Sequence, residues 1–225
     1  LAERMEDREV ECNARTWRML DLAELGRMAE VEEELARLAL AAEHLRSPRH
    51  RWQSTVIRAS LALLAGRIDE AAALAVQAMG LRRAGATNNM QQFFAVQMYH
   101  VRRAQGRQAE VLPLVADAGR TPTLPIWRCG LAQLRAETGD LAGARELLDE
   151  LARDGFAAIP YDANWLPALA ALAETTYLTN AAEHAPALRA RLLPHADLIL
   201  VTGLTTVVLG PISRFLGLLA LTGGD

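Results

Sequence analysis

One helix ends and another begins within the stretch Leu63-Leu64-Ala65-Gly66-Arg67-Ile68-Asp69-Glu70-Ala71. Gly66 supplies the left-handed backbone conformation with which many helices end. Asp69 and Glu70 then fall in the first turn of the next helix, where negative charge complements the helix dipole. The stretch therefore predicts a helical hairpin that turns at Gly66.

The same punctuation recurs along the chain and marks an internal repeat. Glycine followed by a charged residue also occurs at Gly26, Gly106, Gly139 and Gly224, and Asn180 fills the slot between the last two. The first intervals are 40, 40 and 33 residues, which is the range of stacked helical hairpins. We therefore expect an all-α fold, a right-handed superhelical solenoid of about five antiparallel helix hairpins plus a truncated sixth.

Composition agrees with a folded helical chain. Of the 225 residues, 51% are hydrophobic and 23% are charged, and alanine and leucine dominate, so we expect helix and almost no strand. A net charge of −3 gives no general electrostatic reason to bind nucleic acid. Cys12 and Cys129 lie too far apart for a zinc motif or a disulfide framework, and they suit a reducing cytoplasm.

We expect one continuous repeat domain over residues 1–225. Its last apolar run is the one segment that could be mistaken for a membrane span. Residues 198–221 are mostly apolar, with Arg214 as the one charged residue, but Gly210-Pro211 interrupts the run, so it does not resemble a membrane span. We predict two short buried helices there, with Gly203 at a packing contact or bend and Gly210 at the start of the second helix. Asp225 falls where a further helix should begin, so the chain is expected to be a piece of a larger protein.

Small residues recur at matching places in the predicted hairpins. Ala59, Ala132, Ala173 and Gly217 each lie seven residues before a turn residue, and Tyr99 departs from this pattern. In this the chain resembles the tetratricopeptide repeat. Residues 95–107, 125–129, 162–166 and 209–219 also look like passages from the long-helix repeat regions of large bacterial regulators, which combine an ATP-binding signalling module with a cyclase-like or DNA-binding output domain. The resemblance implies a sensor or interaction module, with the ATPase function of such regulators outside this piece.

The residues carry no recognisable reaction chemistry. The five histidines show no metal-ligand spacing, the serines lack a nucleophile motif, and no glycine-rich loop with lysine is present to hold a nucleotide phosphate. We therefore predict no enzyme activity, no metal and no cofactor.

The first helices of such an array line its concave surface, where an extended peptide or helix can bind. The most polar first helix carries arginines suited to carboxylate or phosphate groups, and tryptophans near the starts of other first helices could line a groove. The candidate binding residues are Gln53, Gln97, His100, Arg102, Arg103, Trp127, Gln133, Asn164 and Trp165. A solvated helix face and aromatic wedges between hairpins are the simpler interpretations.

These residues favour binding of a protein segment or a neighbouring domain of the parent chain. The alternative is a small-molecule effector held against Trp127 or Trp165, with Arg102 or Arg103 fixing an anionic group. We expect no direct binding to nucleic acid and no membrane insertion. A homodimer could form through the cut C-terminal end, because an uncapped repeat leaves its apolar surface uncovered.

Overall fold

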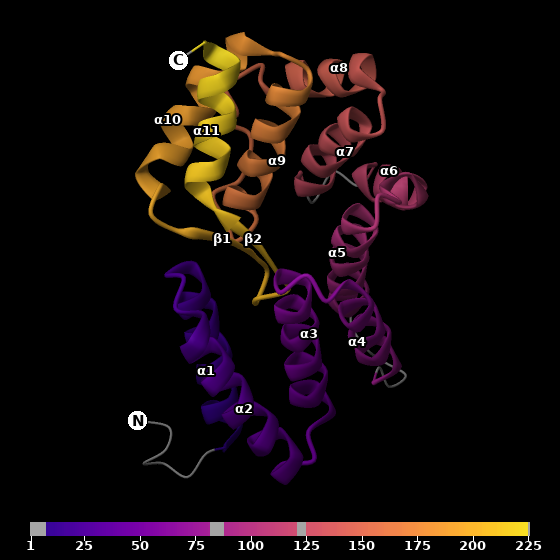
Figure 1. The fold of residues 1–225 in the computed structure, drawn as a ribbon, viewed down its shortest axis with the longest axis vertical. Helices are drawn as coiled ribbons and strands as arrows, with labels where there is room; N and C mark the ends of the chain where they lie inside the picture. The colour runs from indigo at the N-terminus through magenta and orange to yellow at the C-terminus, as the bar shows by residue number, and fades with distance from the viewer. Residues whose placement is uncertain (1–7, 82–87, 121–124, 225) are drawn as a thin grey trace. The chain divides into compact units, whose positions relative to one another are not determined.

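The computed structural model describes residues 8–81, 88–120 and 125–224, and most of them are helical (Figure 1). This confirms the predicted mainly helical class. The right-handed superhelical stacking stays a prediction. The chain divides into two compact units, which we describe separately, and the single-domain organisation likewise stays a prediction.

The described residues of the first unit form five helices and one segment from later in the chain. The helices are α1 (Arg8–Glu24), α2 (Met28–His44), α3 (Pro48–Leu64), α4 (Ile68–Gly80) and α5 (Asn88–Ala104). Each contacts the next along the chain, and α3 also contacts α5. Residues 201–209, which we call the hairpin tip, belong to this unit as well.

The second unit contains the remaining helices. They are η2 (Gln108–Val111), α6 (Leu112–Gly119), α7 (Ile126–Glu137), α8 (Leu141–Leu151), α9 (Trp165–Leu178), η3 (Ala182–His184), α10 (Ala185–Leu192), η4 (Leu193–His195) and α11 (Ile212–Gly223). Within it α7 packs on α8 and α9, and α9 packs on α10 and α11. In this unit α7 and α9 thus each contact the helix that follows them and the first helix of the next pair.

The predicted turn residues all adopt the left-handed conformation. Their φ angles are 72° at Gly26, 74° at Gly66, 69° at Gly106, 92° at Gly139, 84° at Gly224 and 51° at Asn180. At Gly66 the following amide, Arg67 N, donates to Ala62 O at 2.9 Å, which is the bond of the Schellman motif. The predicted punctuation is therefore confirmed as a set of helix C-terminal caps.

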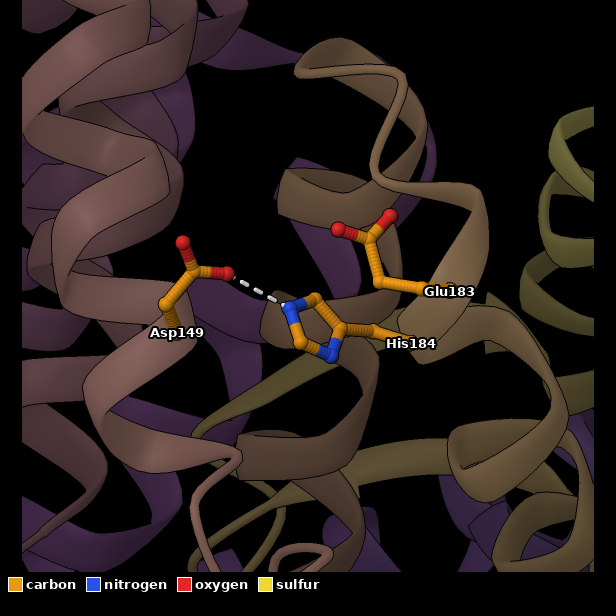
Figure 2. Close-up of side chains that lie close together, drawn as sticks. All are labelled: Asp149, Glu183 and His184. Atoms are coloured by element: carbon orange, nitrogen blue, oxygen red, sulfur yellow. Dashed lines mark hydrogen bonds and ion pairs between the residues drawn. The ribbon is translucent and has the colours of Figure 1, made fainter.

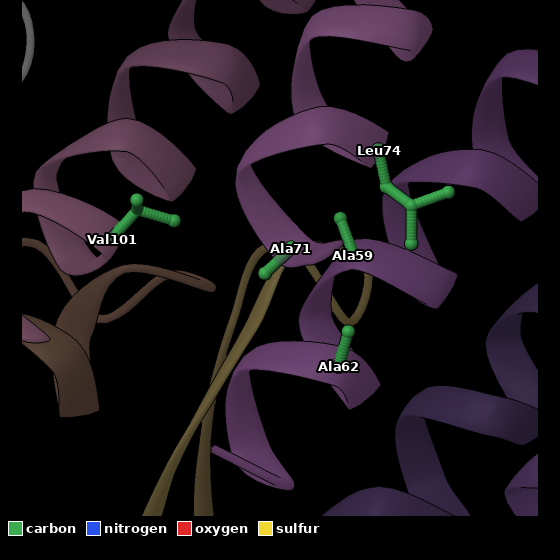
Figure 3. Close-up of a cluster of buried hydrophobic side chains, with 5 residues drawn as sticks. All are labelled: Ala59, Ala62, Ala71, Leu74 and Val101. Atoms are coloured by element: carbon green, nitrogen blue, oxygen red, sulfur yellow. The ribbon is translucent and has the colours of Figure 1, made fainter. Parts of the chain in front are cut away.

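Small residues bring the helices of the first unit close together. Ala59 and Ala62 of α3, Ala71 and Leu74 of α4 and Val101 of α5 form one buried apolar cluster (Figure 3). Alanine side chains at such contacts allow a close backbone approach, and interiors are packed at crystal-like density. The small first-helix positions predicted in this and the second unit, Ala59, Ala132 and Ala173, are all buried.

The prediction of two helices across residues 198–221 is wrong in its first half. Residues 199–211 form a two-stranded sheet of β1 (Ile199–Thr202) and β2 (Val207–Pro211), and only α11 is helical. Isoleucine, valine and threonine favour strands, and Gly203 has a φ of 53° in the turn between them. Within the described parts of the chain, no helix is long and apolar enough to cross a membrane.

Two glycine assignments in this run are also corrected. Gly210 lies in β2 with a φ of 104°, rather than at the start of a helix. Gly217 is exposed on α11, and a Cβ atom built there meets nothing within 4 Å. It is therefore not a close packing position, although Ala59, Ala132 and Ala173 are.

Replacing Gly66 with alanine tests whether the turn depends on backbone freedom. A Cβ at Gly66 meets no atom within 4 Å, so the cost comes from the positive φ alone. We expect Gly66→Ala to lower the free energy of unfolding by about 1 kcal/mol, or the melting temperature by about 2–4 °C. The control Gly80→Ala, at an ordinary helical φ in the same hairpin, should change stability by less than about 0.5 kcal/mol. Equal effects in urea unfolding would refute the capping role.

Candidate functional site

The nine predicted residues are divided between the two units. Gln53 lies on α3, and Gln97, His100, Arg102 and Arg103 lie on α5, all in the first unit. The others belong to the second unit: Trp127 and Gln133 on α7, and Asn164 and Trp165 at the start of α9. Each group is therefore considered by itself.

One face of the first unit holds the turn of a β-hairpin from later in the same chain. We call it the α3–α5 face and define it by Trp52, Gln53, Val56 and Ser60 of α3 with Phe93 and Gln97 of α5. Helical spacing puts the members from each helix on one side of that helix. Gln97, only 2% exposed, donates Nε2 to Val56 O at 2.8 Å and to Thr206 O at 3.0 Å. Its side-chain amide thus joins the backbone of α3 to the backbone of the hairpin tip.

The turn of the hairpin tip fits closely against Phe93. A Cβ atom at Gly203 would lie 2.9 Å from Thr206 Oγ1 and 3.5 Å from the Phe93 ring. The Phe93 ring meets Trp52 edge-on, with ring centroids 5.3 Å apart. Thr205, which is fully buried, has a φ of 58°, which is a strained conformation for a β-branched residue. The contact between this turn and Phe93 therefore depends on the shape of the turn, in which the backbone of Thr205 is strained.

Several buried polar atoms of this region have no hydrogen-bond partner among the described residues. They are Gln53 Oε1, Ser60 Oγ, Gln97 Oε1, Thr205 Oγ1 and Thr206 Oγ1. Buried polar groups in folded proteins are paired in most cases, and an unpaired one costs about 1–3 kcal/mol. The hairpin tip therefore buries the α3–α5 face without giving all of its polar atoms a hydrogen-bond partner. This is unusual for a permanent core.

The predicted basic and histidine residues lie further along α5. The His100 ring meets the Tyr99 ring edge-on at 4.7 Å, and Arg102 donates to Gln105 Oε1 at 2.7 Å. Burial, and to a smaller extent the charge of Arg103, lowers the pKa of His100 to about 3. His100 is therefore neutral at physiological pH and offers a ring nitrogen rather than a positive charge.

In the second unit, Gln133 supports a buried carboxylate that the sequence reasoning missed. Glu174 of α9 is 4% exposed and accepts hydrogen bonds from Gln133 Nε2 and pairs with Arg214 at 2.5 Å. Both charged residues stand alone in apolar runs, Glu174 in α9 and Arg214 in residues 198–221. That isolation is the signal that could have paired them. Gln133 thus has a packing role between α7 and α9.

The predicted aromatic site at the start of α9 is built from three rings. Trp165 lies between Tyr161 and His195, with centroid distances of 4.7 Å and 5.7 Å. Asn164 lines a recess beside it together with Ile126 and Ile159, and the recess has room for about one water-sized sphere, ≈ 10 Å³. Trp127 on α7 is half-buried. A drug-sized ligand needs a pocket of several hundred Å³, so this recess does not provide one.

A cluster of potential metal ligands lies on the surface of the second unit. Asp149, Glu183 and His184 bring one ligand atom each within 4.8 Å of the others (Figure 2). His184 Nε2 lies 2.6 Å from Asp149 Oδ1, and Arg145 pairs with both Asp149 and Glu183. The hydrogen bond from His184, reinforced by Arg145, lowers the pKa of Asp149. Because Arg145 pairs with both carboxylates and His184 bonds to Asp149, the cluster is explained as an ion-pair network.

The chain matches no protein-family model, no curated protein and no solved structure. The resemblance to repeat regions of bacterial regulators therefore stays a prediction. The α3–α5 face is the candidate site, because it is where a long-range segment and buried polar groups meet.

Truncating Arg214 tests the buried pair of the second unit. Removing one partner of a buried ion pair leaves the other charge uncompensated, but Arg214 is 46% solvent-exposed, which weakens the effect. We expect Arg214→Ala to lower the free energy of unfolding by about 2 kcal/mol. The exposed arginine Arg189 of α10 serves as control, since Arg189→Ala should cost less than about 0.5 kcal/mol. The pairing is unimportant if both variants unfold at the same urea concentration.

His100 should make folding sensitive to acid. Its pKa falls from the ordinary 6.5 to about 3 on folding, so the unfolded chain binds the extra proton between these pH values and is favoured there. This contribution to stability is complete above pH 6.5 and is lost as pH falls towards 3. We expect the loss between pH 7 and pH 4 to be about 2–3 kcal/mol larger in the native chain than in His100→Gln. Parallel stability curves for the two proteins over this range would contradict the prediction.

Proposed function

We propose that this chain is a non-catalytic helical-repeat module of a bacterial regulatory protein, and that it binds an extended protein segment on the α3–α5 face. The observation that carries the proposal is the contact of Gln97 with Thr206 O. A side-chain amide that donates to a backbone carbonyl recognises an extended chain whatever its side chains are. Recognition of main chain, with apolar side chains filling the contact, is a common way to bind peptides.

The apolar part of the proposed contact comes from the aromatic pair on the face. Trp52 and Phe93 meet edge-on, and both side chains are partly exposed. Aromatic side chains bury large areas on binding and often dominate binding energy. Two predicted residues, Gln53 and Gln97, belong to this face. His100, Arg102 and Arg103 continue along α5 and supply the polar end of the proposed site.

The small-molecule alternative has less support. It placed a ligand against Trp127 or Trp165, and the recess beside Asn164 has room for about one water-sized sphere, ≈ 10 Å³. Cytoplasmic location and a homodimer through the C-terminal end stay predictions. The lack of catalytic activity is part of the proposal as well.

Site-specific photocrosslinking tests the proposed function. A photoreactive amino acid at position 100 should crosslink to one protein segment, in the full-length regulator or in a partner, whereas the same group at the exposed position 58 of α3 should not. The crosslinked segment is then made as a peptide. His100→Ala with Arg103→Ala should weaken its binding at least about tenfold, or about 1.4 kcal/mol, while Arg58→Ala leaves the dissociation constant unchanged.

Two results would contradict the proposal. One is the absence of any crosslink at position 100, and a small molecule retained in native mass spectra would then favour the alternative. The other is an unchanged dissociation constant in the double variant, provided that its circular dichroism melt matches that of the native chain.

A further inference from the structure

The hairpin tip belongs to the first unit, although it comes from late in the chain. Residues 201–209 group with α1–α5, whereas Gly106–Leu200 and Gly210–Asp225, which flank it, form the second unit. Gln97 and Thr206 are separated by 109 residues along the chain. The tip therefore meets α3 and α5 as a segment from a distant part of the sequence.

The tip is held mainly by its backbone and its shape. Gln97 donates to the carbonyl of Thr206, and Gly203 gives the turn a positive φ and leaves room for Thr206 Oγ1, which would lie 2.9 Å from a Cβ atom there. Val201, Val207 and Val208 are buried. A different segment with a small residue at its turn and apolar neighbours offers the same contacts.

The fit of the tip is incomplete in polar terms. Both threonine hydroxyls at its apex, Thr205 Oγ1 and Thr206 Oγ1, are buried without a hydrogen-bond partner in the described part of the chain, and so is Gln53 Oε1 on α3. Thr205 also holds a positive φ, which is strained for a β-branched residue. Unpaired buried groups and backbone strain both cost free energy, so they make binding of the tip to the α3–α5 face less favourable.

We infer that the hairpin tip is an exchangeable occupant of the α3–α5 face, and that a partner segment binds by replacing it. This inference rests on the proposed function and names its regulation. Because the partner binds only when the tip is not seated, the apparent dissociation constant equals the intrinsic one divided by the fraction of molecules with an open face. The replacing segment is extended, has a glycine or another small residue at its turn, and carries β-branched residues on either side.

A peptide supplied in trans tests the inference on the full chain. The probe is the chain's own residues 199–211, labelled with a fluorophore and extended with lysines for solubility. Gly203→Val should unseat the resident tip, because a Cβ there lies 2.9 Å from Thr206 Oγ1 and the φ of 53° is unfavourable. Gly217→Val, at an exposed helical position with open space around it, is the matched control.

By fluorescence anisotropy, we expect the peptide to bind Gly203→Val at least about tenfold more tightly than it binds the native chain or Gly217→Val. Adding Gln97→Leu to Gly203→Val should weaken binding of the peptide, since the carbonyl of the peptide residue that corresponds to Thr206 loses its donor. Equal affinities for the native chain and Gly203→Val, or no binding to either, overturn the inference.

Hydrogen exchange on the native chain decides the matter if Gly203→Val does not fold. Excess peptide should speed exchange of the amides in residues 201–209 at least about tenfold and leave α3 unchanged. An unchanged rate in the tip overturns the inference. A peptide that exchanges with the tip while position 100 crosslinks to no segment refutes the proposed function alone. If position 100 crosslinks to a segment but the peptide does not exchange with the tip, only the inference that the tip is replaceable is refuted.

Discussion

Helix termination by a left-handed residue is the constraint on which the fold depends. An α-helix has no intrinsic stop, and the last carbonyl groups of a helix need other partners. At Gly66 and Gly139 the positive φ turns the next amide back onto the helix, so that Arg67 N meets Ala62 O and Asp140 N meets Arg135 O. Each turn therefore ends one helix and sets the direction in which the next one leaves.

Close helix pairing is possible because the residues near these turns are small. Ala59 and Ala71 lie within one buried cluster of α3, α4 and α5, and alanine there loses little side-chain entropy on folding.

Two acidic residues are buried among the apolar ones. Glu34 of α2 pairs with Arg15 of α1 and Arg37, and although burial opposes its ionisation, these hydrogen bonds lower its pKa. Glu174 pairs with Arg214 between α9 and α11.

The parts of the fold that the sequence predicted are those set by local chemistry. Gly26, Gly66 and Asn180 could be assigned because a left-handed cap favours glycine or asparagine. The hairpin of residues 199–211 was missed because a short apolar run fits a buried strand as well as a buried helix. Its valines and Thr205 were the signal for strand, and the helical period elsewhere outweighed it.

Long-range pairings in the candidate site were less predictable. Position relative to the turn residues was enough to select Gln53 for the inner side of a first helix, and Gln97 was selected as part of the most polar first helix. It did not show that Gln97 contacts Thr206, since nothing local relates residues 109 positions apart. The Glu174–Arg214 pair was missed for the same reason, although each residue is a single charge in an apolar run.

The polar character of the α3–α5 face separates a replaceable contact from a permanent core. An apolar residue at position 97 would bury more hydrocarbon against the hairpin tip, but it would leave Thr206 O without the donor that Gln97 supplies. Glutamine instead ties the tip by one hydrogen bond to a backbone carbonyl, while its own Oε1 stays unpaired among the described residues. Such a contact contributes little net free energy but depends strongly on geometry. A face built in this way selects an extended backbone without holding any one sequence tightly.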